Sequence, residues 1–145
     1  MPTIPASIRD RVFDCILPAY VLTDTYDFLA FNAAFRCLIA QEVGIEVGAP
    51  VSRMIDALEN GPAIWNRAAV QFAPGRVPEA DHEYLRFSSA RYGLVEMQKF
   101  AARIPVSAEG AALWLIQLNI ISSPKLQQLF DDLIASVIRA RDDAP

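Results

Sequence analysis

The fold is decided by residues 19–32, which read AYVLTDTYDFLAFN. Two short runs, 19–23 and 28–31, are rich in aromatic and aliphatic side chains of the kind that favour strands. The acidic segment between them, 24–27, is typical of a turn. Together the three parts predict a tight β-hairpin early in the chain.

A helix is expected directly after this hairpin. Asn32 suits its N-cap, because an asparagine side-chain oxygen accepts hydrogen bonds from the first free helical N–H groups. The helix expected over 33–43 places Phe35, Leu38 and Ile39 on one face. The sequence therefore predicts a strand, turn, strand and capped helix in immediate succession.

A second hairpin is predicted in the C-terminal half. Residues 100–106 alternate in the manner of a strand, and 111–121 carry the strongest strand pattern in the chain. One face of that second strand is unbroken and apolar, and it consists of Trp114, Ile116, Leu118 and Ile120. Residues 107–110 form the expected turn. The pattern over 92–98 leaves helix and strand both open.

The remaining segments carry helical patterns. Short helices are expected at 7–17, 50–60, 62–73 and 79–91. Ser123 and Pro124 open a last helix as N-cap and first helical residue. The order predicts an α+β domain in which both hairpins share one antiparallel sheet. We expect a single domain over 1–145, with a flanking helix at 1–17, a core at 18–121 and a C-terminal helix and tail at 122–145.

Composition excludes several classes of protein. The chain has 145 residues, 53% of them hydrophobic, which fits one folded domain and excludes a disordered chain. Its 13 Lys and Arg against 17 Asp and Glu give a net charge of −4, which argues against direct nucleic-acid binding. No signal peptide or membrane-spanning run is recognisable, so we expect a soluble cytoplasmic protein. Free thiols at Cys15 and Cys37 are favoured over a disulfide.

Two segments carry a resemblance to a known family. LPAYVLTD at 17–24 and DFLAFNAAF at 27–35 resemble the opening of a PAS domain, in which a strand, a turn, a strand ending in asparagine and a helix of small residues recur. The sequence is most similar to the ligand-binding domain of MmyB-like bacterial transcription regulators. Trp65 in a mid-chain helix and residues 122–124 before the last helix also have counterparts there.

The resemblance implies a sensor module. Its fold would be a curved antiparallel sheet, built from an N-terminal and a C-terminal hairpin, with short helices over one face enclosing a small-molecule pocket. MmyB-like domains are thought to bind fatty acids or similar apolar ligands. They normally follow an N-terminal helix-turn-helix, and this sequence has none, which leaves direct DNA binding in doubt.

The candidate chemical groups favour no enzyme. His82 lies between acidic neighbours and is best interpreted as solvated rather than as a haem ligand or acid–base group. Cys37 lacks the asparagine–cysteine–arginine segment through which flavin-binding relatives attach, so we expect it in the core. The paired aspartates are best explained as solvated groups rather than metal ligands. We therefore expect no catalytic residue, no metal and no haem or flavin cofactor.

The apolar side chains indicate a candidate ligand-binding site. Aromatic and aliphatic residues from several elements would converge over the sheet, where they line a ligand pocket or form an ordinary packed core. The candidate ligand-binding residues are Tyr20, Phe31, Trp65, Arg67, Phe72, Tyr84, Phe87, Trp114, Ile116 and Leu118. Arg67, or another cation at the rim, would hold the headgroup of a fatty-acid-like ligand.

We therefore expect a non-enzymatic regulatory sensor that binds a small hydrophobic molecule. Leu113, Leu115 and the wide apolar stripe of the last helix predict a homodimer, unless the terminal helices fold back over their own sheet. The alternative is a ligand-free interaction and dimerisation module of the same fold. An enzyme that uses His82 with a nearby carboxylate is a more distant alternative.

Overall fold

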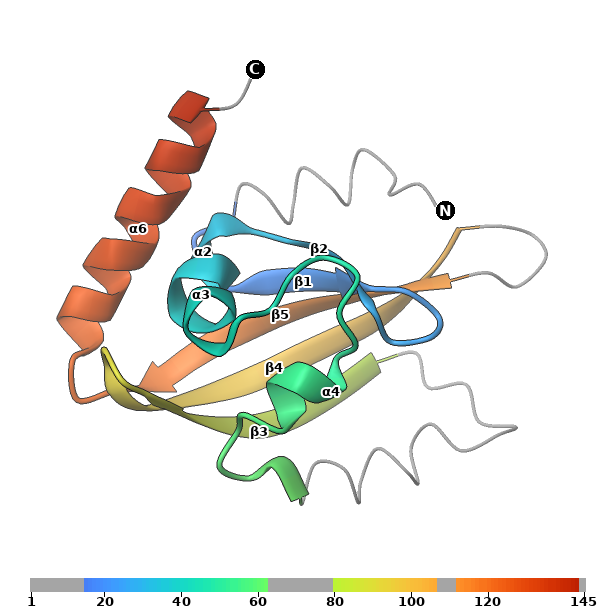
Figure 1. Ribbon diagram of the computed structural model, residues 1–145, viewed down its shortest axis with the longest axis horizontal. Coiled ribbons are helices and arrows are strands. Elements are labelled where there is room, and N and C mark those ends of the chain that lie inside the picture. The colour runs from blue at the N-terminus through green and yellow to red at the C-terminus, as the bar shows by residue number, and fades with distance from the viewer. Residues whose placement is uncertain (1–14, 63–79, 107–111, 144–145) are drawn as a thin grey trace.

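The computed structural model describes residues 15–62, 80–106 and 112–143 (Figure 1). Its elements, in chain order, are β1 (Ala19–Leu22), β2 (Phe28–Phe31), α2 (Ala33–Phe35), the π-helical segment η1 (Arg36–Ala40), α3 (Gln41–Val43), α4 (Ser52–Ile55), β3 (Ala80–Ser89), β4 (Gly93–Pro105), β5 (Ala112–Ser122) and α6 (Leu126–Asp143). No helix in these three ranges is long and apolar enough to cross a membrane.

The five strands form one antiparallel sheet in the order β2-β1-β5-β4-β3. Strand β1 pairs with β5, and Tyr20 stands opposite Ile116. The N-terminal hairpin and the C-terminal strands therefore share one sheet, as the sequence predicts. Helices α2, α3 and α4 lie over one face of this sheet (Figure 1), which we call the inner face.

The first hairpin and its helix follow the sequence closely. The Asn32 side chain accepts a hydrogen bond from the backbone N–H of Phe35, at 2.9 Å, and caps α2. The helical run α2–η1–α3 ends at Gly44, whose φ of 85° is favourable for glycine because it has no Cβ. Phe35, Leu38 and Ile39 are buried, which confirms the predicted apolar face.

The prediction of a helix over 79–91 is wrong. This segment is β3, and its side chains alternate between the buried Glu83, Leu85 and Phe87 and the exposed Tyr84 and Ser88. His82 lies in the same strand. The physical reason is the long partner strand β4, which pairs with β3 along its whole length and satisfies its backbone groups.

Other segments also differ from the expectation. Of the helix expected over 50–60, only the four residues of α4 are α-helical. Residues 92–98 resolve as a turn at Tyr92 followed by the first part of β4. Residues 15–17 of the expected N-terminal helix are not helical. The rest of that helix, the helix after Pro62 and the turn at 107–110 lie outside the described residues.

The last helix, α6, stands beyond one end of the sheet, beside α2 (Figure 1). It begins at Leu126, two residues later than the sequence predicts, and the Ser123 hydroxyl accepts from the N–H of Lys125 in the turn before it. Leu129, Leu133 and Val137 are buried in the main core, whereas Ile134 and Ile138 remain 41% and 51% exposed. The helix therefore packs on its own chain and keeps a second, exposed apolar edge.

A smaller apolar cluster covers part of the outer face of the sheet. Its buried members are Ala19, Val21 and Leu113, and Leu115 packs against them. Because Leu113 is buried within a single chain, it needs no partner molecule to cover it. Burial of Leu113 by itself therefore gives no reason for a dimer, and the exposed edge of α6 is the stronger argument for one.

Candidate functional site

The inner face of the sheet is the candidate ligand site. Alternation along β1 and β5 points Tyr20, Leu22, Trp114, Ile116 and Leu118 to the same side. Each of these residues is at most 6% exposed, and all belong to the main core cluster. Three strands thus build one continuous apolar surface beneath the helices, since β4 continues it through Ala101 and Met97.

The predicted site residues divide into three groups. Tyr20, Phe31, Phe87, Trp114, Ile116 and Leu118 come together in the main core cluster. Tyr84 does not join them, because it lies on the opposite face of β3 and is 36% exposed. Trp65, Arg67 and Phe72 lie outside the described residues.

One end of this surface is closely packed. Four aromatic rings pack against one another here, with contacting ring centroids 4.9–6.2 Å apart, and they belong to Tyr20, Phe28, Phe31 and Phe35. Aromatic pairs at such distances gain contact energy beyond simple burial. The rings therefore anchor α2 to β1 and β2.

A charged pair lies within the apolar surface at its other end. Lys99 Nζ is 3.1 Å from Glu83 Oε2, and the two residues stand directly opposite one another on β4 and β3. Their side chains are only 14% and 6% exposed. Sequence reasoning missed this pair because it assigned Glu83 to a helix. In residues 83–88 the odd positions are acidic or apolar and the even positions are polar. This strand-like alternation was the signal that could have found the pair.

A second polar group lies near the start of β5. Arg103 stands opposite Trp114 in the ladder between β4 and β5 and is half-buried. Burial raises the pKa of the nearby Tyr26 hydroxyl, and the carboxylate of Asp24 raises it further. A hydrogen bond from Trp114 and the positive charge of Arg103 oppose this shift. Cationic and hydrogen-bonding groups therefore border the apolar surface.

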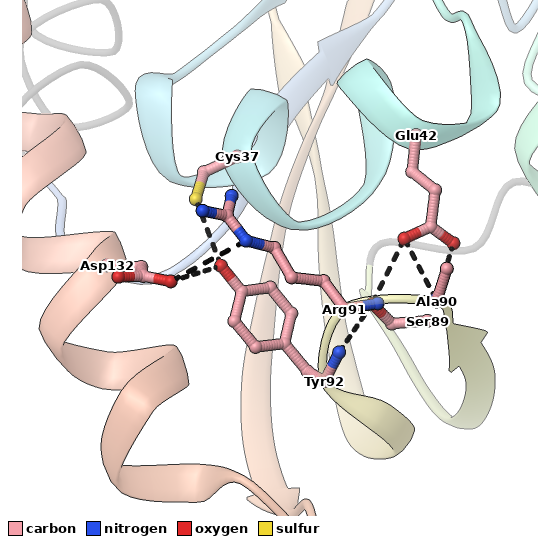
Figure 2. A network of polar contacts seen from close by, with 7 residues as sticks. All are labelled: Cys37, Glu42, Ser89, Ala90, Arg91, Tyr92 and Asp132. Atoms are coloured by element: carbon pink, nitrogen blue, oxygen red, sulfur yellow. Dashed lines mark hydrogen bonds and ion pairs between the residues drawn. The ribbon is translucent and has the colours of Figure 1, made fainter.

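A polar network joins the turn between β3 and β4 to α6 (Figure 2). The hydroxyl of Tyr92, a fully buried residue, donates to Asp132 Oδ2 at 2.7 Å. Cys37 Sγ on η1 lies 3.7 Å from the same hydroxyl, and Arg91 Nε is 4.0 Å from Asp132. Both cysteines are free thiols, as expected, although they are half-buried rather than fully buried.

The same turn is also fixed to the inner-face helices. Glu42 accepts hydrogen bonds from the Ser89 hydroxyl and the Ala90 N–H at 3.0–3.1 Å (Figure 2). The Ser89 hydroxyl in turn accepts from the N–H of Tyr92. Three elements distant in sequence, α2–η1–α3, the β3–β4 turn and α6, therefore meet at Tyr92.

Comparison with known proteins connects this geometry to a fold. No protein-family model and no curated protein matches the sequence. Among solved structures, the PAS domain of Bordetella pertussis BvgS is 13% identical, with 90% of this chain and 96% of that chain covered and a TM-score of 0.56. The fold is that of a PAS domain. The inner face, with α2, α3 and α4 above it, is thus the helix-covered face of a PAS sheet.

Two further structures share the PAS fold. The Rhodobacter sphaeroides LOV protein is 11% identical, covers 95% of this chain and 96% of its own, and has a TM-score of 0.55. An RNA-binding light-oxygen-voltage receptor is 13% identical, covers 99% of this chain and 42% of its own, and has a TM-score of 0.52. Neither is described as MmyB-like, so that closer resemblance stays a prediction.

The PAS core carries no group of three His, Cys, Asp or Glu side chains that could hold a metal, within the parts of the chain that the structure describes. Cys37 contacts Tyr92 and points toward α6 rather than the inner face (Figure 2). What the PAS site offers is therefore burial of apolar surface, one internal ion pair and a few polar groups at its border.

Tyr92→Phe tests how firmly the PAS core holds α6. Burial first, and then the hydrogen bonds to Asp132 and Cys37, raise the pKa of Tyr92 well above the ordinary tyrosine value of 10.0. When folding raises the pKa of a tyrosine, the neutral hydroxyl contributes its full stabilisation at every pH below the unfolded-state pKa. This contribution is lost as pH rises from there toward the folded-state pKa. We expect the variant to lose about 2 kcal/mol of unfolding free energy at pH 7.

Above about pH 10 that difference should shrink, because ionisation of Tyr92 in the unfolded chain lowers the stability of the wild type alone. Urea unfolding of both proteins between pH 7 and pH 11 measures it. Stability curves that stay parallel across this range would contradict the role given to the hydroxyl.

Proposed function

We propose that this PAS-fold domain is a non-enzymatic regulatory sensor whose inner face binds a small hydrophobic ligand of the fatty-acid class. The continuous apolar surface of β1, β4 and β5 carries the proposal, because apolar burial contributes about 25 cal/mol per Å². Binding would favour one arrangement of the helices over the sheet and shift the population toward it. We further propose that it acts in bacterial transcription regulation or signal transduction.

The polar border supports an amphiphilic ligand rather than a pure hydrocarbon. Arg103 is half-buried beside Trp114, at the edge of the apolar surface. A carboxylate headgroup at this edge would form charge-assisted hydrogen bonds with such a guanidinium. We propose Arg103 for the rim position for which the sequence suggested Arg67 or another cation.

Two neighbouring alanines of β4 give a matched test of this site. Ala101 is 6% exposed and belongs to the main core on the inner face, whereas Ala102 pairs with Leu115 of the outer cluster. Hexadecanoic acid should raise the melting temperature of the wild type and of Ala102→Phe, but not of Ala101→Phe. In a solid core, Ala101→Phe would instead cost about 1–3 kcal/mol through overpacking, and no protein would respond to the acid.

Signalling is proposed to pass through a homodimer built on α6. Ile134 and Ile138 form an exposed apolar pair one helical turn apart. The Tyr92 network ties this helix to the inner-face helices, so that a ligand-driven shift would reach the dimer contact.

Light scattering of Ile134→Glu/Ile138→Glu tests the dimer. We expect a dimeric wild type and a monomeric variant, because the charged pair would be buried without partners. A wild-type monomer at high micromolar concentration would refute it.

The alternative, a ligand-free dimerisation module, is supported by the close ring packing of Tyr20, Phe28 and Phe35. It predicts the same dimer with no response to fatty acid.

A further inference from the structure

We propose that the groove between η1 and α6 is a second binding site, which takes a small oxyanion of the carboxylate or phosphate-monoester class. The groove has a volume of about 160 Å³ and lies between η1 and α6, two helical segments that contact one another. Arg36 and Cys37 line it from η1, and Ser136 and Arg139 line it from α6.

The charge of this groove is one-sided. Its lining includes two arginines and no acidic side chain. Arg36 lies over the Phe31 ring, with its guanidinium carbon 5.6 Å from the ring centroid. Among the described residues, neither Arg36 nor Arg139 forms an ion pair with a carboxylate. Two guanidinium groups from facing helices thus share a concave surface without an internal counter-ion.

One acidic residue of α6, Asp132, is already engaged. Asp132 lies one helical turn before Ser136 and accepts from Tyr92, with Arg91 4.0 Å away. It therefore has little capacity left to neutralise Arg139. An external oxyanion would supply the missing negative charge, and a guanidinium fork matches carboxylate and phosphate oxygens in a bidentate manner.

Further groups in the groove suit an oxyanion. The Ser136 hydroxyl, the Gln41 side-chain amide and the Cys37 thiol are donors that line the same space. Ala33 and Ala140 leave room between the helices because their side chains are small. At about 160 Å³ the groove is smaller than the ~300 Å³ or more of a typical organic-ligand site. It therefore fits a single headgroup rather than a large molecule.

Occupancy of this groove would bridge the PAS core to α6. One arginine belongs to the core helix and the other to α6, so that an oxyanion held by both resists separation of the two elements. Cys37 links the groove to the Tyr92 network, because its Sγ lies 3.7 Å from the Tyr92 hydroxyl. The site is distinct from the inner face, and it stands whether or not a fatty acid binds there.

Isothermal titration calorimetry at constant ionic strength tests the proposal, with methyl phosphate and acetate as separate probes. We expect saturable binding of at least one probe to the wild type, and which one saturates assigns the class. Arg36→Gln and Arg139→Gln should each weaken it by roughly tenfold, the loss expected for one charged hydrogen bond. Arg53→Gln, an exposed arginine on α4, is the matched control and should bind like the wild type.

Arg139→Lys keeps the charge but removes the fork, and its affinity should lie between those of the wild type and Arg139→Gln. Circular dichroism must show that each variant is folded, and the exposed positions of both arginines favour this. Binding of neither probe to the wild type would overturn the proposal. Equal affinities across all the arginine variants would also overturn it, because they would reveal a general electrolyte effect only.

Discussion

Replacing Asn32 with alanine should lower the free energy of unfolding by about 3–5 kcal/mol. The residue is fully buried, and its side-chain oxygen accepts from the N–H groups of Ala19 and Phe35 at 3.1 and 2.9 Å. Its amide donates to the carbonyls of Cys15 and Leu17 at 3.1 and 2.8 Å. Alanine would leave several buried backbone groups without partners and would remove the cap of α2.

The intermediate variant Asn32→Asp separates the two halves of this network. Aspartate keeps the oxygen that caps α2 but cannot donate to the two carbonyls, so its stability should fall between those of the wild type and Asn32→Ala. Urea unfolding followed by circular dichroism measures the three proteins.

Asn60→Ala serves as the control for this prediction. Asn60 also bridges backbone groups, donating to the Tyr84 carbonyl at 2.8 Å and accepting from the Arg86 N–H at 3.0 Å. It lies half-buried at the edge strand β3, where water can replace it. We expect a loss of about 1 kcal/mol. Equal losses at the two positions would contradict the central role given to Asn32.

Lys99→Met should destabilise the domain by about 3–5 kcal/mol, because it breaks the ion pair of the buried Glu83 carboxylate. Glu83→Leu should act in the same way on Lys99. The double variant Glu83→Leu/Lys99→Met should recover most of the loss, since apolar side chains of similar volume suit this surface. Thermal and urea unfolding of all four proteins form a double-mutant cycle.

A surface ion pair gives the control for this cycle. Glu59 and Arg86 are 3.5 Å apart, with side chains 43% and 41% exposed. Exposed pairs contribute little because water screens them, so Glu59→Leu should cost less than about 1 kcal/mol. If the losses at Glu83 and Lys99 simply add in the double variant, the pair is not an energetic unit.

The N-terminal hairpin could be predicted because its signals are local. Two strand-forming runs, an acidic turn and Asn32 follow one another without interruption, and each acts on its immediate neighbours. The strong apolar alternation of 112–122 likewise identifies β5. The pairing of β1 with β5 followed from the expectation that both hairpins bury apolar faces in one sheet.

The segment 79–91 could not be assigned in this way. Leu85, Arg86 and Glu83 also suit a helix, and the choice between helix and strand was made by the distant partner β4. Because the strand was missed, Tyr84 was assigned to the site and the Glu83–Lys99 pair was not found. Tyr92 and Asp132 are 40 residues apart in the sequence, and no local pattern predicts their contact.

The proposed sensor function depends on ligand binding at the inner face. Native mass spectrometry of the purified protein, after incubation with hexadecanoic acid, tests it most directly. We predict one bound acid per chain for the wild type and for Ala102→Phe, and none for Ala101→Phe. An unmodified mass for all three proteins, at concentrations where the acid is in excess, would contradict the sensor function.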